Sequence, residues 1–368
     1  MHPLKQLPQL GQSIWLDYID RHLVTRGGLT RLMEEDALRG VTSNPAIFEK
    51  AIGSDVDYRT DLEAMRDQGL SPIGKLERLV LPDIRAAAGQ LRTVYVATGR
   101  RDGYVSLEVP PALAHDTAAS LAEARRLWQA VGHDNLMIKV PATDAGLPVI
   151  TALIADGINV NVTLLFSQAM HVRVAEAYLA GLEQRVAAGL SVEGIASVAS
   201  FFVSRIDAVV DERLAARLAA AAEDTEREAI HGLMGKAAIA NAKLAYRNWK
   251  ALFSGPRWQA LADRGAHSQR LLWASTGVKN PAYRDVRYIE ELIGPDTVNT
   301  VPPATLDAFR DHGQVRLSLE EDVDEAIDAL EALKAQGIVL DEVTDRLLDD
   351  GVTLFVQAYD TLLRSLAH

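Results

Sequence analysis

Cysteine is absent from this chain of 368 residues. Without cysteine, the protein has no disulfides, thiolate metal sites, iron–sulfur clusters or cysteine nucleophile. The absence fits a reducing compartment, and we expect a cytoplasmic location. The nine histidines do not gather at predicted strand ends, and the motifs G-x-G-x-x-G, P-loop and H-E-x-x-H are missing. The sequence therefore predicts no metal site.

Long apolar runs and an excess of positive charge are also missing. No stretch approaches the roughly 18 uninterrupted apolar residues of a membrane span. The first ten residues hold two prolines and lack the apolar centre of a signal peptide. Lysine and arginine number 38 against 50 aspartates and glutamates, which gives a net charge of −12. Because nucleic acids and anionic membranes bind positive surfaces, we expect neither as a partner, although a small basic pocket for one phosphate is compatible with this charge.

What the sequence does contain is a repeated order of strand and helix patterns. Eight short apolar runs have the length of strands: residues 13–17, 40–44, 104–109, 136–140, 159–165, 196–202, 271–276 and 298–301. Strands that alternate with helices indicate a parallel sheet. The length allows two domains, but eight strands favour one (β/α)8 TIM barrel, an α/β fold, over residues 1–368. We expect additional helices in an insertion at about residues 49–100 and in a C-terminal segment at about 317–368, where residues 342–366 have the pattern of a helix docked by one face.

Polar side chains stand at or near the ends of almost all of these apolar runs. They are Asp17, Asn44, Glu108, Lys139, Thr163, Ser200 and Ser275. A single such residue is usually structural. In a TIM barrel, however, catalytic residues lie at the carboxyl ends of the strands. Seven polar residues that converge on one rim therefore predict an active site.

Lys139 is the most informative of these residues because it interrupts the apolar run Met137 to Pro141. One interpretation is a core lysine that is merely paired with Glu108 or Asp17, or whose ammonium extends to the rim of the barrel. The other is an amine nucleophile, because burial in an apolar barrel mouth disfavours the charged ammonium, and a neutral amine forms a Schiff base with a ketone. Schiff-base chemistry needs proton transfers, which two carboxylates in different environments could carry.

Two cations follow neighbouring strands. Arg205 comes after the sixth predicted strand, and Lys279 comes after the seventh. Either one alone would be an ordinary surface charge. Together with nearby serines they predict a phosphate-binding pocket, since charged donors form strong hydrogen bonds to phosphate.

Three segments carry a resemblance to a known family. Residues 40–48 read GVTSNPAIF and look like the first signature of the transaldolase family. Residues 136–147, LMIKVPATDAGL, resemble the second signature, which holds the Schiff-base lysine. Residues 157–167 are similar to the fifth-strand segment. The resemblance spans residues 12–310 as an ordered set, and the length with its insertion looks like the longer bacterial subgroup.

The resemblance implies a cofactor-free enzyme of the non-oxidative pentose phosphate pathway. For the oligomeric state we expect a monomer or a homodimer. The enzyme would transfer a dihydroxyacetone unit from sedoheptulose 7-phosphate to glyceraldehyde 3-phosphate, giving erythrose 4-phosphate and fructose 6-phosphate. By the same resemblance Lys139 is the nucleophile, and Glu108 is the acid/base acting through water held by Thr163. Asp17 is the base at the substrate hydroxyl.

The resemblance also implies the substrate-binding residues, with two departures. Asn44 and Ser200 would hold the dihydroxyacetone part, while Arg205 and Ser275 are similar to phosphate ligands. Lys279 stands in a seventh-strand motif that is longer than usual and has lysine where the family has arginine, and lysine lacks arginine's bidentate fork. Phe202 has no hydroxyl that could activate water, which favours transfer over simple aldol cleavage.

Two alternative functions remain open at the level of sequence. One is another Schiff-base sugar-phosphate aldolase, such as a fructose 6-phosphate or deoxyribose phosphate aldolase. The other is a sugar-phosphate-binding protein without catalytic activity. The complete set of polar residues argues against the second alternative, because a decayed site usually loses its acid/base first.

Overall fold

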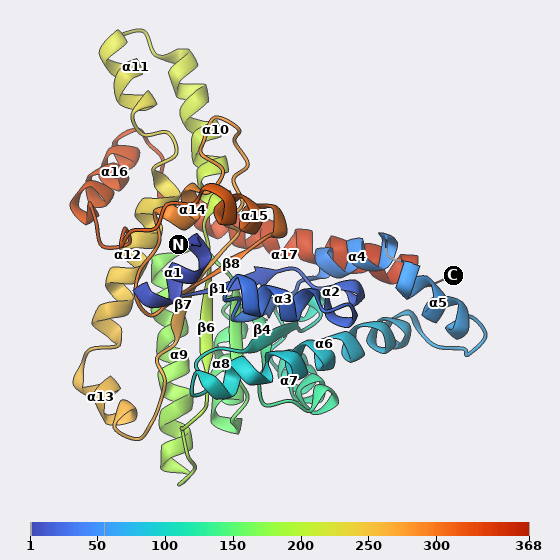
Figure 1. The fold of residues 1–368 in the computed structure, drawn as a ribbon. Coiled ribbons are helices and arrows are strands. Elements are labelled where there is room, and N and C mark those ends of the chain that lie inside the picture. Colours follow the sequence, from blue (N-terminus) through green and yellow to red (C-terminus); the bar gives the residue numbers. More distant parts are fainter. Residues whose placement is uncertain (1, 55, 368) are drawn as a thin grey trace.

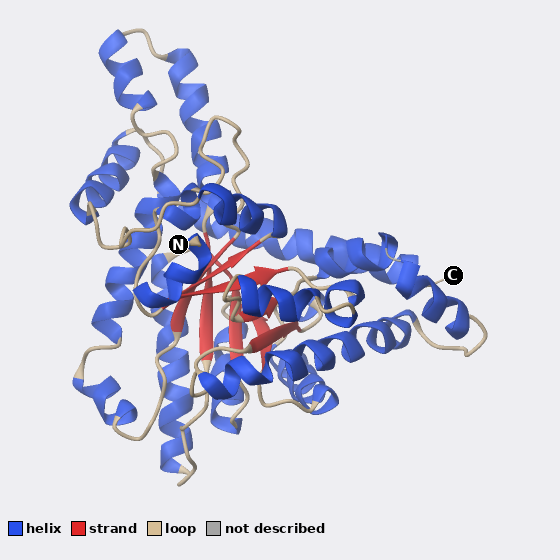
Figure 2. Cartoon of the chain, in the orientation of Figure 1, coloured by secondary structure: helices blue, strands red, loops and turns tan. Residues whose placement is uncertain are grey.

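A closed barrel of eight parallel strands forms the centre of the computed structural model, which describes residues 2–54 and 56–367. Figure 2 shows these strands in red, surrounded by helices. In order around the barrel they are β1 (Gln12–Asp17), β2 (Gly40–Thr42), β3 (Tyr104–Glu108), β4 (Leu136–Pro141), β5 (Val160–Leu165), β6 (Ser197–Phe202), β7 (Arg270–Ala274) and β8 (Thr297–Val301). The predicted (β/α)8 barrel is confirmed, and each strand overlaps one of the predicted runs.

Helices connect the strands and extend beyond them (Figure 1). They are α1 (Pro3–Gln6), α2 (Arg21–Thr25), α3 (Gly28–Glu35), α4 (Pro45–Ser54), α5 (Val56–Met65), α6 (Pro72–Ala97), α7 (Thr117–Val131), α8 (Gly146–Asp156), α9 (Gln168–Ala187), α10 (Ser204–Ala220), α11 (Asp224–His231), α12 (Ala237–Leu252), α13 (Pro256–Ala262), α14 (Arg287–Glu290), α15 (Pro303–His312), α16 (Val323–Ala335) and α17 (Leu340–Ser365), with the 3₁₀ turns η1 (Leu7–Leu10) and η2 (Pro111–Leu113). Among the described residues, no helix is long and apolar enough to cross a bilayer.

Local sequence signals explain where several of these helices begin and end. The Asp116 carboxylate accepts a hydrogen bond from the Ala119 amide at the start of α7, and Gly132 adopts a left-handed conformation just after it. Short polar side chains satisfy free amides at a helix start, and glycine tolerates the positive φ at its end. In the same way, the Ser71 hydroxyl accepts a hydrogen bond from a backbone amide at the start of α6, and the Ser167 hydroxyl does so at the start of α9.

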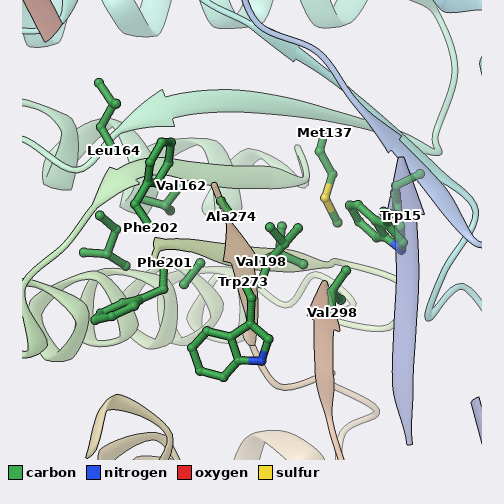
Figure 3. Packing of buried hydrophobic residues seen from close by; sticks show 14 of the residues in the cluster. Trp15, Met137, Val162, Leu164, Val198, Phe201, Phe202, Trp273, Ala274 and Val298 are labelled. Atoms are coloured by element: carbon green, nitrogen blue, oxygen red, sulfur yellow. The ribbon is translucent and has the colours of Figure 1, made fainter. Parts of the chain in front are cut away.

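The lower part of the barrel interior is filled by apolar side chains and closed by a buried ion pair. Figure 3 shows part of the apolar packing, including Trp15, Met137 and Val298. Gly40 on β2 makes room for Trp15, because a Cβ atom at position 40 would lie only 2.5 Å from the indole. Below it, an Arg270 Nη donates to Asp102 at 2.9 Å, and both side chains are buried. This filled base leaves the opposite end of the barrel as the place for a site.

The two segments expected to add helices to the barrel are both helical. The segment expected to be a helical insertion contains most of α4 together with α5 and α6, and the expected C-terminal segment contains α16 and α17. In Figure 1, α10 and α11 extend away from the barrel, whereas α17 runs alongside α4. Helix α17 also contacts β5 and η2. The C-terminal helix thus lies beside β5 and beside the segment that follows β3.

Candidate active site

A cavity of about 630 Å³ opens at the carboxyl ends of the strands. Its walls contain nine of the ten residues singled out in the sequence: Asp17, Asn44, Lys139, Thr163, Ser200, Phe202, Arg205, Ser275 and Lys279. The tenth, Glu108, contacts Lys139. The alternation of side chains along a strand explains the grouping, since residues two apart face the same side.

Lys139 lines this cavity and is 5% exposed. Its Nζ is 3.2 Å from Glu108 Oε2 and donates a hydrogen bond to the Ser43 carbonyl at 2.9 Å. The two residues face each other because β3 and β4 pair with Glu108 opposite Lys139. The ion pair between Lys139 and Glu108, which the interpretation of Lys139 as a structural core lysine predicted, is therefore present. It lies in a cavity rather than in closed packing, so it is equally compatible with the nucleophile interpretation.

Asp17 is the second carboxylate of the candidate site, and it lines the cavity directly. Thr42 donates a hydrogen bond to Asp17 Oδ1 at 2.8 Å, and the Thr42 hydroxyl lies 2.7 Å from the Thr300 hydroxyl. Burial raises the pKa of Asp17, while the charge of Lys139 and the Thr42 hydrogen bond oppose the rise. Burial also raises the pKa of Glu108, again against the charge of Lys139. Both carboxyl groups therefore keep a proton to higher pH than a free side chain, which suits proton transfer near neutral pH.

Thr163 sits at an irregular point of β5. Its hydroxyl is buried and has no hydrogen-bond partner among the residues the structure describes. The next residue, Leu164, has φ +55°, and the pairing of β5 with β6 shifts register between Val162 and Leu165. A bulge of this kind re-aims a side chain, and backbone strain in non-glycine residues concentrates at functional sites.

Ser200 and Asn44 are held by neighbouring groups. The Ser200 hydroxyl donates to Asn161 Oδ1 at 2.6 Å, and the Asn161 amide donates in turn to the Ser106 hydroxyl at 3.0 Å. Asn44 follows β2 instead of ending it, and its Oδ1 accepts from the Ile47 amide at 3.0 Å in the first turn of α4. The side chains of Ser200 and Asn44 therefore have fixed positions at the cavity wall.

The cations that follow β6 and β7 differ in their surroundings. Arg205 is the second residue of α10, and its guanidinium carbon is 5.7 Å from the centre of the Phe202 ring. Burial lowers the pKa of Arg205, and no described carboxylate offsets that burial. Ser275 follows β7 with φ +56°, and its hydroxyl lies 3.0 Å from that of Ser204. Lys279 lines the same cavity and is exposed.

Several cavity residues were not anticipated from the sequence. Thr42 and Thr300 could have been found, because they occupy inward positions on strands neighbouring Asp17. Asn161 does not line the cavity itself, but its side chain supports the wall through its hydrogen bonds with Ser200 and Ser106. Lys50 on α4 and Phe355 on α17 also line the cavity. No local pattern marks these last two, because tertiary packing alone brings their helices to the mouth.

Comparisons with known proteins agree with this geometry. The family model described as Transaldolase/Fructose-6-phosphate aldolase matches residues 14–366. Transaldolase 2 of Nostoc sp. is 50% identical over 366 residues, which cover 99% of this chain and 96% of that protein. Transaldolase of Trichodesmium erythraeum is 46% identical over 365 residues, covering 99% and 96% of the two chains. Transaldolase of Neisseria meningitidis serogroup A is 46% identical over 363 residues and 99% of both chains.

Proposed function

Because the chain belongs to the transaldolase/fructose-6-phosphate aldolase family, we propose that it is a transaldolase of the non-oxidative pentose phosphate pathway. It transfers a dihydroxyacetone unit from sedoheptulose 7-phosphate to glyceraldehyde 3-phosphate, and erythrose 4-phosphate and fructose 6-phosphate are the products. The observation that carries the proposal is the buried Lys139–Glu108 pair, 3.2 Å apart, whose lysine lines a cavity large enough for a sugar phosphate. A cytoplasmic, single-domain protein, as a monomer or homodimer, is part of the same proposal.

The reaction begins with attack of the Lys139 amine on the ketone carbon of the donor. Glu108 moves protons to and from the carbinolamine through a water molecule held by Thr163, and loss of water leaves the Schiff base. Asp17 takes the proton from the C4 hydroxyl, the C3–C4 bond breaks, and the aldehyde product departs. The three-carbon enamine that stays on Lys139 then attacks the aldehyde carbon of the acceptor, which forms a new Schiff base. Addition of water to this Schiff base and breakage of its C–N bond release the product ketose phosphate and the free Lys139 amine. The raised pKa values of Glu108 and Asp17 support these proton-transfer roles.

Substrate recognition is divided between two ends of the cavity. Asn44 and Ser200 bind the hydroxyl groups of the dihydroxyacetone part, and their own hydrogen bonds keep them in place. Arg205, Ser275 and Lys279 bind the phosphate. A half-buried guanidinium that pairs with no carboxylate in the described part of the chain supports this role, because an anionic ligand would compensate its burial. Local cations of this kind attract anionic substrates to a protein whose net charge is −12.

Replacement of Arg205 by methionine should reduce kcat/KM for fructose 6-phosphate by about 10- to 100-fold, since a hydrogen bond to a charged group contributes about 1.5–3 kcal/mol. The loss should appear mainly in KM. With unphosphorylated fructose as donor the variant and the wild type should differ little. The matched control is Arg213→Met, because Arg213 lies on the same helix and does not line the cavity. Equal losses with both donors would contradict a phosphate-binding role.

The dependence of turnover on an acceptor separates a transaldolase from an aldolase. With sedoheptulose 7-phosphate and glyceraldehyde 3-phosphate together, we expect stoichiometric fructose 6-phosphate and erythrose 4-phosphate. With fructose 6-phosphate alone, little free dihydroxyacetone should be released. Phe202 supports this outcome because it offers no hydroxyl for activating water. Steady release of dihydroxyacetone without an acceptor would instead establish the aldolase alternative.

A further inference from the structure

One stripe of the C-terminal helix α17 faces the barrel mouth. Gly351, Phe355, Tyr359 and Leu362 are spaced four, four and three residues apart, which places them on one side of a helix. Gly351, Phe355 and Leu362 are buried, and Tyr359 is partly buried. The docking predicted for this helix is therefore observed. The contacts of these four residues connect the helix to the candidate active site as well as to the barrel core.

The first contact of the stripe is with the irregular part of β5. A Cβ atom at Gly351 would lie 3.0 Å from Leu164 Cδ2 and 3.8 Å from the Phe166 ring, so the helix approaches β5 as closely as a residue without a side chain permits. Leu164 directly follows Thr163 and has φ +55°. Helix α17 is thus packed onto the bulge that carries Thr163.

The next three members of the stripe line cavities that also include Lys139 or Glu108. Phe355 lines the main cavity together with Lys139 and Thr163. One turn further on, Tyr359 and Leu362 line a small apolar cavity of about 60 Å³ whose wall also includes Glu108 and Asn44. Along the helix, Phe355 lies between Gly351, which packs against the residue after Thr163, and Tyr359, which lines a cavity together with Glu108. The stripe therefore lines cavities shared with Lys139, Thr163 and Glu108, and α17 also contacts α10, the helix that carries Arg205.

We propose that Phe355 determines transfer specificity by excluding water from the covalent intermediate. The inference rests on the proposed function, because it concerns the three-carbon enamine on Lys139. Hydrolysis of that species needs a proton on the former C3 carbon and addition of water to the resulting iminium carbon. The C–N bond then breaks, which gives dihydroxyacetone and the free Lys139 amine with one water consumed. An apolar ring over the amine end keeps bulk water from this route until an aldehyde acceptor arrives.

Phe355→Ala should change how the intermediate partitions between hydrolysis and transfer. We expect the ratio of free dihydroxyacetone to transfer product to rise about tenfold, which corresponds to about 1.4 kcal/mol of lost discrimination. The ratio is measured with fructose 6-phosphate as donor at one fixed concentration of erythrose 4-phosphate. The matched control is Leu354→Ala, because Leu354 is the preceding residue and is 50% exposed. The control should leave the ratio unchanged.

The outcomes separate this inference from the proposed function. If the wild type transfers and the ratio is unchanged in Phe355→Ala, or both products fall in proportion, the inference is wrong and the function stands. If the wild type itself performs no transfer, the function is wrong. Should Phe355→Ala not fold, as circular dichroism would reveal, Phe355→Leu decides. A smaller rise of the ratio in the leucine variant supports water exclusion, and an unchanged ratio overturns it.

Discussion

Replacement of Lys139 by methionine should lower transaldolase turnover by on the order of 10⁴-fold or more, which corresponds to at least about 5 kcal/mol of lost transition-state stabilisation. Methionine has a similar length but no amine, so no Schiff base can form. The substitution leaves Glu108 without its cation at 3.2 Å. A buried carboxyl without a partner takes up a proton, so we expect the variant to fold. Coupled assay of fructose 6-phosphate formation measures the loss.

A second buried lysine provides the control for this experiment. Lys243 on α12 is also 5% exposed, and its Nζ donates to the Glu321 carbonyl at 2.6 Å, outside the active-site cavity. Lys243→Met therefore removes a buried amine of the same kind without touching the site. It should retain turnover within a factor of a few. A Lys139→Met enzyme that kept more than about one hundredth of wild-type turnover would rule out the covalent mechanism, because that loss is only about 2.7 kcal/mol.

Glu108→Gln should reduce kcat by about 10²- to 10⁴-fold, the range that general acid–base catalysis contributes. Glutamine keeps the shape of the side chain but cannot accept the proton, so binding of fructose 6-phosphate should change much less than kcat. Glu290 supplies the matched control, because it is a buried glutamate paired with Arg284 at 2.8 Å and lies outside the active-site cavity. Equal losses of kcat in Glu108→Gln and Glu290→Gln would contradict the acid/base role.

The pH profile gives a second readout of the same variant. Burial raises the pKa of Glu108 above its ordinary value of 4.5, so the ionised form that accepts a proton is lost as the pH falls through this raised value. The acid limb of kcat/KM for the wild type should therefore lie above pH 4.5. Asp17 has a raised pKa as well, so the limb belongs to the pair of carboxyl groups. Glu108→Gln should leave a limb that reflects Asp17 alone.

The sequence predicted the barrel and the grouping of its polar residues because both follow from local patterns. Strand length, alternation and a polar residue near each strand end are properties of short segments. Because side chains alternate between the two faces of a strand, those of Asp17, Lys139 and Thr163 lie on the inner face and line one cavity. Boundaries were less accurate. Ser275 follows β7 instead of ending it, because its positive φ takes the chain out of the strand.

The remaining parts of the site depend on contacts between segments distant in the chain. Phe355 reaches the cavity only because α17 packs against β5 and α4. The spacing of the apolar residues in this helix indicated that it docks by one face. That spacing could not indicate which residues of the barrel the face would contact. The hydrogen bond from Thr42 to Asp17 likewise depends on the register of β1 with β2. Register and helix placement are set by tertiary packing, which single-segment patterns do not contain.

Reductive trapping tests the central claim, that Lys139 carries the covalent intermediate, most directly. Borohydride added during turnover of fructose 6-phosphate reduces the imine to a stable secondary amine, and peptide mass mapping then locates the modified lysine. Lys50 and Lys279 line the same cavity and are exposed, so the experiment has internal competitors. We predict an adduct on the peptide that contains Lys139 in the wild type, and none in Lys139→Met. An adduct on Lys50 or Lys279 instead, or no substrate-dependent adduct at all, would contradict the account.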